Sequence, residues 1–194
     1  MNFKNYKDEG KKYGVGGVSF QLKEGENKIR ILSHPEEIGN HFMGAGQMPA
    51  ICTDIQTGKK CPYCKTSKRI MKIKMYILDR ADEQIKIATF SWSIYAQIGQ
   101  LAESSEWGFE SLPSYDLIIT RTGTGKETRY GVIPTPNQKP ITVDQQAKLA
   151  KLKPIEELIQ GFIIKQSSNE SPAPSAENMP PETDESMPDF LQPN

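Results

Sequence analysis

The sequence predicts a mainly β domain with short helices, and three observations support this fold class. Short apolar segments separated by turn sequences recur from residue 18 to residue 164. Within residues 69–78, apolar and polar side chains alternate as on a strand with one buried face. The apolar positions of that segment are Met71, Ile73, Met75 and Ile77. Glycine-containing turn sequences at residues 25–27 and 122–126 join neighbouring segments.

Six strands and two helical segments are expected in this domain. The expected strands span residues 18–23, 28–32, 69–78, 85–93, 115–121 and 128–133. The third and fourth, and likewise the fifth and sixth, are expected to form antiparallel hairpins. Residues 94–104 have apolar side chains at helical spacing, and residues 142–160 have a helical pattern that Pro154 interrupts.

Charged residues divide the chain into a basic body and an acidic tail. Residues 1–165 carry 24 Lys and Arg against 18 acids, whereas residues 166–194 carry six acids and no base. Six prolines and five serines leave this last segment too little apolar surface to fold alone. We therefore expect a basic mobile arm over residues 1–17, a folded domain over residues 18–165 and a disordered acidic tail over residues 166–194.

Near the end of the tail, apolar residues follow closely after acidic residues in the sequence. This composition is typical of a short peptide that docks on a partner protein. The candidate partner-binding residues are Asp184, Glu185, Met187, Pro188, Asp189, Phe190 and Leu191. The alternative is a tail that only improves solubility.

Three cysteines and one histidine have the spacing of a metal site. Ten, eight and two residues separate them in the order His41, Cys52, Cys61 and Cys64. Zinc takes four nitrogen or sulfur ligands in a tetrahedron, and a C-x-x-C pair supplies two thiolates from one turn. We expect one structural Zn²⁺ per chain, in a knuckle over residues 41–64. His34 is the competing candidate for the histidine ligand.

The sequence Cys61-Pro62-Tyr63-Cys64 is also the redox motif of glutaredoxins. In that motif the first cysteine follows a buried parallel strand and begins a helix. Here a polar, turn-like segment at residues 54–60 precedes Cys61, and a hairpin pattern follows, so a thiol–disulfide oxidoreductase is the weaker alternative. Ordinary buried cysteines are a third interpretation. Because the sequence contains no P-loop, G-x-S-x-G or H-E-x-x-H motif, we expect neither an enzymatic activity nor a small-molecule substrate.

Basic and aromatic residues gather on the expected strands. Residues 59–74 include seven Lys and Arg and no acid. Such cations neutralise phosphates and exposed rings stack on bases, a combination that single-stranded nucleic acid requires. The candidate strand-binding residues are Arg30, Lys72, Lys74, Tyr76, Trp92, Arg121 and Arg129. For the aromatic side chains, burial in the core of a sheet is the alternative.

The order of these features resembles the zinc-containing single-stranded-DNA-binding proteins of tailed phages, whose best-known member is the T-even helix-destabilising protein. The similarity covers roughly residues 18–165: the segment 28–32, then His41, Cys52 and the Cys61–Cys64 motif, then the basic strands. It implies an OB-fold core, a five-stranded Greek-key barrel, with the zinc knuckle inserted. It also implies sequence-independent binding of single-stranded DNA, with an acidic tail that recruits replication and recombination proteins.

The expected function is therefore the coating and protection of single-stranded DNA in phage-type replication, recombination and repair. An RNA-binding zinc module is the alternative, because nothing in the sequence distinguishes the 2′-hydroxyl. The first eight residues lack the apolar core of a signal peptide, and no apolar run approaches the roughly 18 residues that span a bilayer. We expect a cytoplasmic protein without a membrane partner, located in the host bacterial cytoplasm if a phage encodes it.

Overall fold

The computed structural model describes residues 18–44, 49–136 and 139–168. In chain order the strands are β1 (Val18–Ser19), β2 (Gly25–Ile31), β3 (Glu36–His41), β4 (Ala50–Ile51), β5 (Arg69–Asp79), β6 (Gln84–Ser91), β7 (Asp116–Thr122) and β8 (Arg129–Thr135). The helices are α2 (Thr53–Thr57), α3 (Trp92–Ala102), α4 (Val143–Ala150) and α5 (Ile155–Ser168), with 3₁₀ segments η2 (Pro62–Lys65) and η3 (Gly125–Glu127). The mainly β class is confirmed. The predictions for residues 1–17 and 169–194, which include the candidate partner-binding residues, lie outside the described residues.

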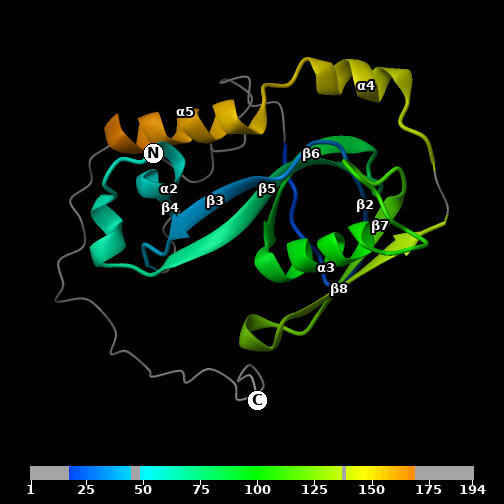
Figure 1. Ribbon diagram of the computed structural model, residues 1–194, viewed down its shortest axis with the longest axis horizontal. Coiled ribbons are helices and arrows are strands. Elements are labelled where there is room, and N and C mark those ends of the chain that lie inside the picture. Colours follow the sequence, from blue (N-terminus) through cyan, green and yellow to red (C-terminus); the bar gives the residue numbers. More distant parts are fainter. Residues whose placement is uncertain (1–17, 45–48, 137–138, 169–194) are drawn as a thin grey trace.

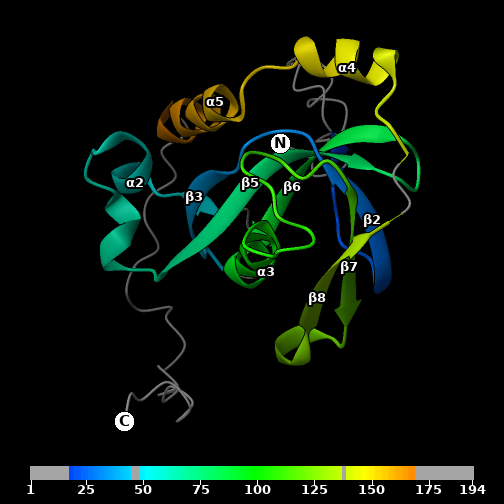
Figure 2. The same cartoon turned by 45° about the vertical axis from the view of Figure 1, so that its right-hand side comes forward.

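Strand β5 is at the centre of the sheet, because it pairs with three other strands (Figures 1 and 2). The described strands are ordered β1-β6-β5-β2-β7-β8, and β3 pairs with both β4 and β5. All pairs are antiparallel except β1 with β6. The last residues of β5 pair with β2 and its first residues pair with β3, so β2 and β3 behave as one bent strand.

One hydrophobic core lies between the sheet and α3. The sheet residues in it are Ile29, Ile31, Ile73, Met75, Ile77, Ala88, Phe90, Leu117, Ile119 and Val132. Helix α3 contributes Ile94 and Ile98, which are four residues apart and therefore share one face. The alternation predicted for β5 is confirmed at Ile73, Met75 and Ile77, all of which are buried.

A second core lies on the opposite face of β5, under α5. This helix presents a stripe of apolar residues at helical spacing: Ile155, Leu158, Ile159 and Ile163. They belong to the same cluster as Tyr76 and Leu78 of β5 and Ile87 of β6. Strand β5 is therefore buried on both faces, which accounts for its continuous apolar run at residues 75–78.

The strand predictions differ from the structure in three places. The expected strand at residues 18–23 pairs only over Val18–Ser19. The expected strand at residues 85–93 ends at Ser91, because α3 already begins at Trp92. Strands β3 and β4 have no counterpart in the prediction.

The helical pattern at residues 142–160 divides at Pro154 into α4 and α5, as expected. Thr142 and Gln145 form a capping box that defines the start of α4. Helix α5 continues to Ser168, three residues beyond the predicted domain boundary. No helix in the described part of the chain has the length and apolar character needed to cross a membrane.

A buried carboxylate, Asp116, connects β2, β7 and the end of β5. It is fully buried and accepts hydrogen bonds from Arg30 Nε at 2.7 Å and from Arg80 Nε at 3.0 Å. Arg80 also pairs with Glu83, whose carboxylate binds Lys139 Nζ at 2.9 Å. Two nearly buried guanidinium groups therefore share this one carboxylate, which is the carboxylate partner of Arg30 and one of two carboxylate partners of Arg80.

We expect Asp116→Asn to lower the free energy of unfolding by about 3–5 kcal/mol, because it leaves Arg30 buried without its counter-ion and leaves Arg80 with Glu83 alone. Urea denaturation followed by circular dichroism measures this. Asp144→Asn, at an exposed position of α4, is the matched control and should cost less than about 1 kcal/mol. Wild-type stability of Asp116→Asn would contradict this account of the cluster.

Candidate metal centre and nucleic-acid surface

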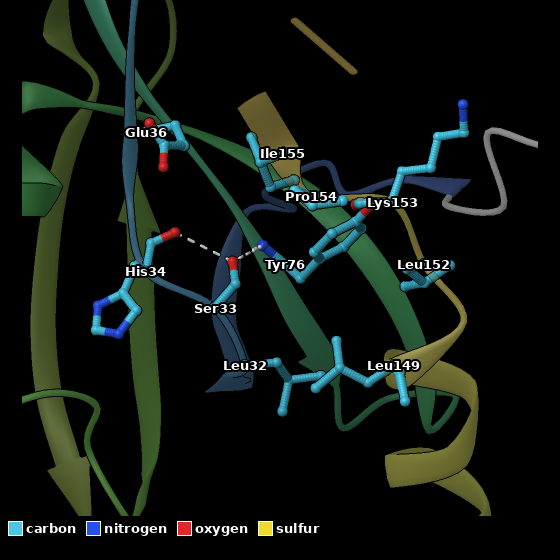
Figure 3. Close-up of a pocket in the computed structure, with 11 residues that line it drawn as sticks. Leu32, Ser33, His34, Glu36, Tyr76, Leu149, Leu152, Lys153, Pro154 and Ile155 are labelled. Carbon is cyan, nitrogen blue, oxygen red and sulfur yellow. Dashed lines mark hydrogen bonds between the residues drawn. The ribbon is translucent and has the colours of Figure 1, made fainter. Parts of the chain in front are cut away.

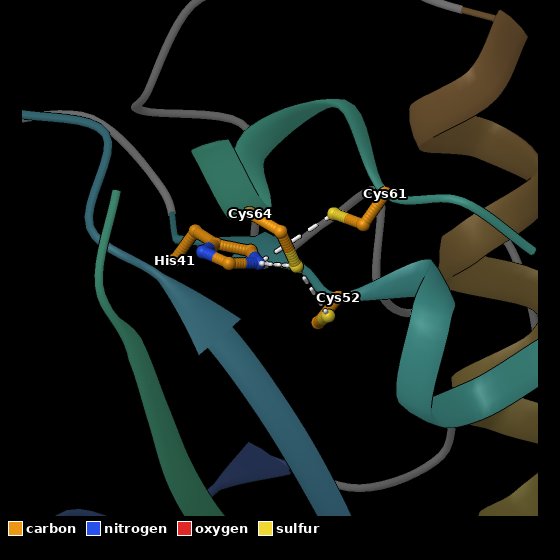
Figure 4. Close-up of side chains that lie close together, drawn as sticks. All are labelled: His41, Cys52, Cys61 and Cys64. Atoms are coloured by element: carbon orange, nitrogen blue, oxygen red, sulfur yellow. Dashed lines mark hydrogen bonds between the residues drawn. The ribbon is translucent and has the colours of Figure 1, made fainter. Parts of the chain in front are cut away.

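The four predicted metal ligands come together beside one end of β5: His41, Cys52, Cys61 and Cys64 (Figure 4). Strand β3 ends with His41, and the short strand β4 leads directly to Cys52, which precedes α2. Cys61 precedes η2, and Cys64 lies within it. The N–H groups of residues 66 and 67 both donate to the Tyr63 carbonyl and close this tight turn.

The ligand atoms are close enough to share one ion, since all four lie within 4.8 Å of one another. Cys52 Sγ lies 3.5 Å from Cys64 Sγ. His41 Nε2 lies 3.5 Å from Cys61 Sγ and 3.6 Å from Cys64 Sγ. His41, Cys52 and Cys61 are buried, whereas Cys64 is exposed. The cluster could therefore hold a metal ion with one ligand at the surface.

Neighbouring groups orient these ligands. His41 Nδ1 lies 3.0 Å from the Ser67 carbonyl, which can only accept, so the ring proton sits on Nδ1 and Nε2 is free to ligate. Arg69 Nη1 lies 4.0 Å from Cys52 Sγ and 3.3 Å from Asp54 Oδ2. A cation beside the cluster offsets the negative charge of several thiolates.

Gly39 permits the close approach of α2 to β3. The Cys52 N–H donates to the Gly39 carbonyl at 2.7 Å. A Cβ atom at Gly39 would lie 2.8 Å from Ile55 Cδ1 and 3.1 Å from Cys52 Cβ. A larger residue would therefore press against Ile55 and Cys52. Gly39 is not among the predicted site residues, although a glycine within a strand often indicates a place where another backbone approaches closely.

The thiols of the cluster differ in acidity. Burial disfavours the Cys52 thiolate, but hydrogen bonds from the Ile55 N–H and three neighbouring side chains outweigh this and lower the pKa of Cys52 to about 6. Partial desolvation and the sulfurs of Cys52 and Cys61 raise the pKa of Cys64 to about 11. Metal ions bind thiolates, so an ion that enters the cluster displaces the Cys64 proton.

His34, the competing ligand, lies away from the cysteines. It lines an open pocket of about 380 Å³ beside the connection between α4 and α5 (Figure 3). Its Nε2 lies 3.4 Å from Ser111 Oγ. The structure therefore assembles the cluster with His41, as predicted.

The face of β5 predicted to bind a strand is covered by α5. Tyr76 is 4% exposed, and its hydroxyl donates to the Lys153 carbonyl at 2.9 Å. The Lys74 ammonium lies 5.1 Å from the centre of the Phe162 ring, and burial lowers the pKa of Lys74. Lys72 is half-buried. The prediction of an open face that carries Lys74 and Tyr76 is wrong, because that face packs against a helix.

The predicted arginines have three different environments. Arg30 is 5% exposed and pairs with Asp116, so the prediction that it contacts phosphates is wrong. Arg121 is half-buried at the end of β7, where its Nη1 donates to the Leu22 carbonyl at 3.1 Å. Arg129 is exposed at the start of β8.

Trp92 is 54% exposed at the first position of α3. Its ring centroid lies 5.4 Å from that of Tyr95, which packs against the first core. Lys72 pairs in register with Ser91, the residue before Trp92, so the backbone at the start of β5 lies beside the start of α3. Tyr95 is not among the predicted site residues, although its i,i+3 spacing from Trp92 places both side chains on one face of a helix.

We expect protein purified without chelators to carry one metal ion per chain and His41→Asn to lose it, because three thiolates alone leave the coordination incomplete. His34→Asn is the matched control and should retain the ion. Elemental analysis of both variants measures the metal content. Full metal content in His41→Asn, or its loss in His34→Asn, would contradict the assignment of the ligands.

In comparisons with known proteins, no family model, no curated protein and no solved structure matches the chain. The candidate site therefore stands on the geometry of its own residues.

Proposed function

We propose that the chain is a non-enzymatic protein that binds single-stranded DNA without sequence preference and coats it in phage-type replication, recombination and repair. The observation that carries this proposal is the exposed Trp92, which is supported by Tyr95 and directly follows Ser91, the register partner of Lys72. An aromatic face stacks on any base, and nearby cations follow the phosphates, so the combination tolerates every sequence. Recruitment of replication and recombination proteins by the acidic segment at residues 166–194 is part of the proposal.

The connectivity of the strands supports an OB-fold. We count β2 and β3 together as the first strand, so that β5, β6, β7 and β8 are the second to fifth strands along the chain. In the sheet these five strands lie in the order β6-β5-β2-β7-β8, that is, third, second, first, fourth and fifth. A helix, α3, stands between the third and fourth of these strands. This is the arrangement of OB-folds, in which the loops after the first and fourth strands contact nucleic acid. Here the first loop contains the metal cluster, and the second is the β7–β8 hairpin.

Helix α5 restricts where a strand can bind. It covers the outer face of β5, but the metal knuckle, the start of α3 and the β7–β8 hairpin carry exposed residues. Figures 1 and 2 show α3 between α2 of the knuckle and the end of the hairpin. We define the proposed binding surface as Lys59, Lys60, Lys65, Lys68, Arg69, Lys72, Trp92, Tyr95 and Arg129.

The donor set of the cluster favours zinc. Three cysteines and one histidine form a common tetrahedral set of structural zinc sites. Bond lengths of about 2.3 Å to sulfur and about 2.0 Å to nitrogen place tetrahedral ligand atoms about 3.5–3.8 Å apart. The separations of 3.5 and 3.6 Å within the cluster agree with this. Four protein ligands leave no position for a substrate water, so the proposed zinc stabilises the knuckle and performs no catalysis.

A thiol–disulfide oxidoreductase is less well supported. Cys61 would be the attacking cysteine, but it is only 4% exposed, whereas Cys64 is exposed. The segment that Cys61 precedes is a four-residue 3₁₀ helix, which offers less stabilisation to a thiolate than a full α-helix. A substrate disulfide would therefore reach the exposed Cys64 sulfur before the buried sulfur of Cys61.

Trp92→Ala should weaken oligo-dT binding roughly 5- to 150-fold, because one stacked base contributes about 1–3 kcal/mol. The slope of log affinity against log salt should stay unchanged, since the indole neutralises no phosphate. Fluorescence anisotropy of labelled oligo-dT at several salt concentrations measures both quantities. Trp107→Phe, at a half-buried position beside Tyr115, is the control. Unchanged affinity of Trp92→Ala would remove the contact that carries the proposal.

The preference for DNA rests on the family resemblance, and competition between matched oligomers tests it. Unlabelled oligo-dU should displace labelled oligo-dT at a lower concentration than oligo-U of the same length. The two competitors differ only in the 2′-hydroxyl, so stacking and charge are held constant. Stronger displacement by oligo-U would favour the RNA-binding alternative.

A further inference from the structure

Gln97 attaches α3 to the edge of β8 at two points. Its Nε2 donates to the Tyr130 carbonyl at 3.0 Å, and its Oε1 accepts from the Val132 N–H at 3.0 Å. Strand β8 is last in the order of the described strands, so these two peptide groups lie on its unpaired edge. The side-chain amide therefore takes the hydrogen-bonding role of a neighbouring strand.

The same side chain is bonded to the first turn of α3. Gln97 Nε2 lies 3.2 Å from the carbonyl oxygen of Ser93, the residue after Trp92. One amide thus connects the backbone beside the exposed indole with the backbone of β8. Gln97 is half-buried, and partial exclusion of water strengthens its hydrogen bonds.

These hydrogen bonds restrict the position of α3 relative to β8 in a way that its apolar contacts do not. Ile94 and Ile98 determine which face of the helix is buried, but apolar burial alone is non-directional. Ser91, which precedes the helix, forms no capping hydrogen bond through its side chain. Strand β6 leads directly into the start of α3, and the two hydrogen bonds of Gln97 attach the middle of the helix to β8.

The geometry points to Gln97 as a positioning residue for nucleic-acid binding. By holding α3 against β8, it sets the position of Trp92 and Tyr95 relative to Arg129 and the β7–β8 hairpin. A bound strand must reach the ring faces with its bases and the cations with its phosphates at the same time, so this relative position decides affinity. The inference rests on the proposed function, in which Trp92 stacks on a base, and Gln97 acts through Trp92 without touching the strand.

A double-mutant cycle tests this role. Gln97→Met removes the hydrogen bonds and keeps an unbranched side chain of similar length and helix propensity. It should weaken oligo-dT binding about three- to tenfold in the wild-type background, and it should cause no further loss in the Trp92→Ala background. Gln100→Met, the same change at an exposed position of α3, should bind like the wild type. Anisotropy of labelled oligo-dT measures the affinities of the four proteins of the cycle and of the Gln100→Met control.

The outcomes separate this inference from the proposed function. An unchanged affinity of Gln97→Met, or an equal loss in both backgrounds, overturns the positioning role and leaves the proposed function intact. If Trp92→Ala itself binds as tightly as the wild type, the base contact of the proposed function fails, and the role of Gln97 fails with it.

A second variant covers the case in which Gln97→Met does not fold. Gln97→Glu keeps the acceptor for the Val132 N–H but cannot donate to the Tyr130 carbonyl when it is ionised. Circular dichroism and thermal melts establish that it is folded. It should then show the same dependence on Trp92, whereas a lower melting temperature with unchanged oligo-dT affinity would overturn the proposal.

Discussion

Burial of β5 on both faces is the constraint on which the rest of the structure depends. One face joins the core with α3, and the other joins the core under α5. Its edges pair with β2, β3 and β6, so the middle of the strand has no surface left for a ligand. Its first residues, from Arg69 to Lys72, have exposed or half-buried side chains, and beyond them only Lys74, whose ammonium lies 5.1 Å from the centre of the Phe162 ring of α5, is half-buried. The accessible basic residues of β5, Arg69 and Lys72, therefore lie at its first residues, near the start of α3 and the cluster of His41 and the cysteines.

The cluster of His41 and three cysteines lies at that end of the sheet and could hold a metal ion there. His41 pairs in register with Arg69, and the three cysteines come from the segment that connects β3 to β5. An ion held by all four ligands would cross-link this segment to β3 and reduce the conformational freedom of a lysine-rich stretch of chain. In this account the metal does no chemistry on the nucleic acid. In the proposed function such an ion would hold the cations of the knuckle at fixed positions, so that less entropy would be lost when a strand binds.

Local patterns in the sequence predicted those features whose determinants are close together in the chain. Alternation over residues 69–78 located β5, and four metal-binding side chains within 24 positions located the cluster, including the choice of His41 over His34. The start of α3 was missed because the aromatic and β-branched residues before it favour a strand, and tertiary packing overrides that preference.

Contacts between distant parts of the chain could not be predicted in this way. Arg30 and Asp116 are 86 residues apart, and a carboxylate within an apolar strand indicates only that some partner is required. The covering of Tyr76 by α5 likewise joins distant segments. Its local signal is the apolar run at residues 75–78, which is typical of a strand buried on both faces.

The most direct test of the central claim is the affinity of the intact chain for single-stranded DNA as a function of salt, in the presence of a duplex competitor. The account predicts that labelled oligo-dT binds at low salt, that the affinity falls as a power of the salt concentration, and that duplex of equal length displaces it poorly, because paired bases cannot stack on Trp92. No binding at low salt, or equal displacement by duplex, would contradict it.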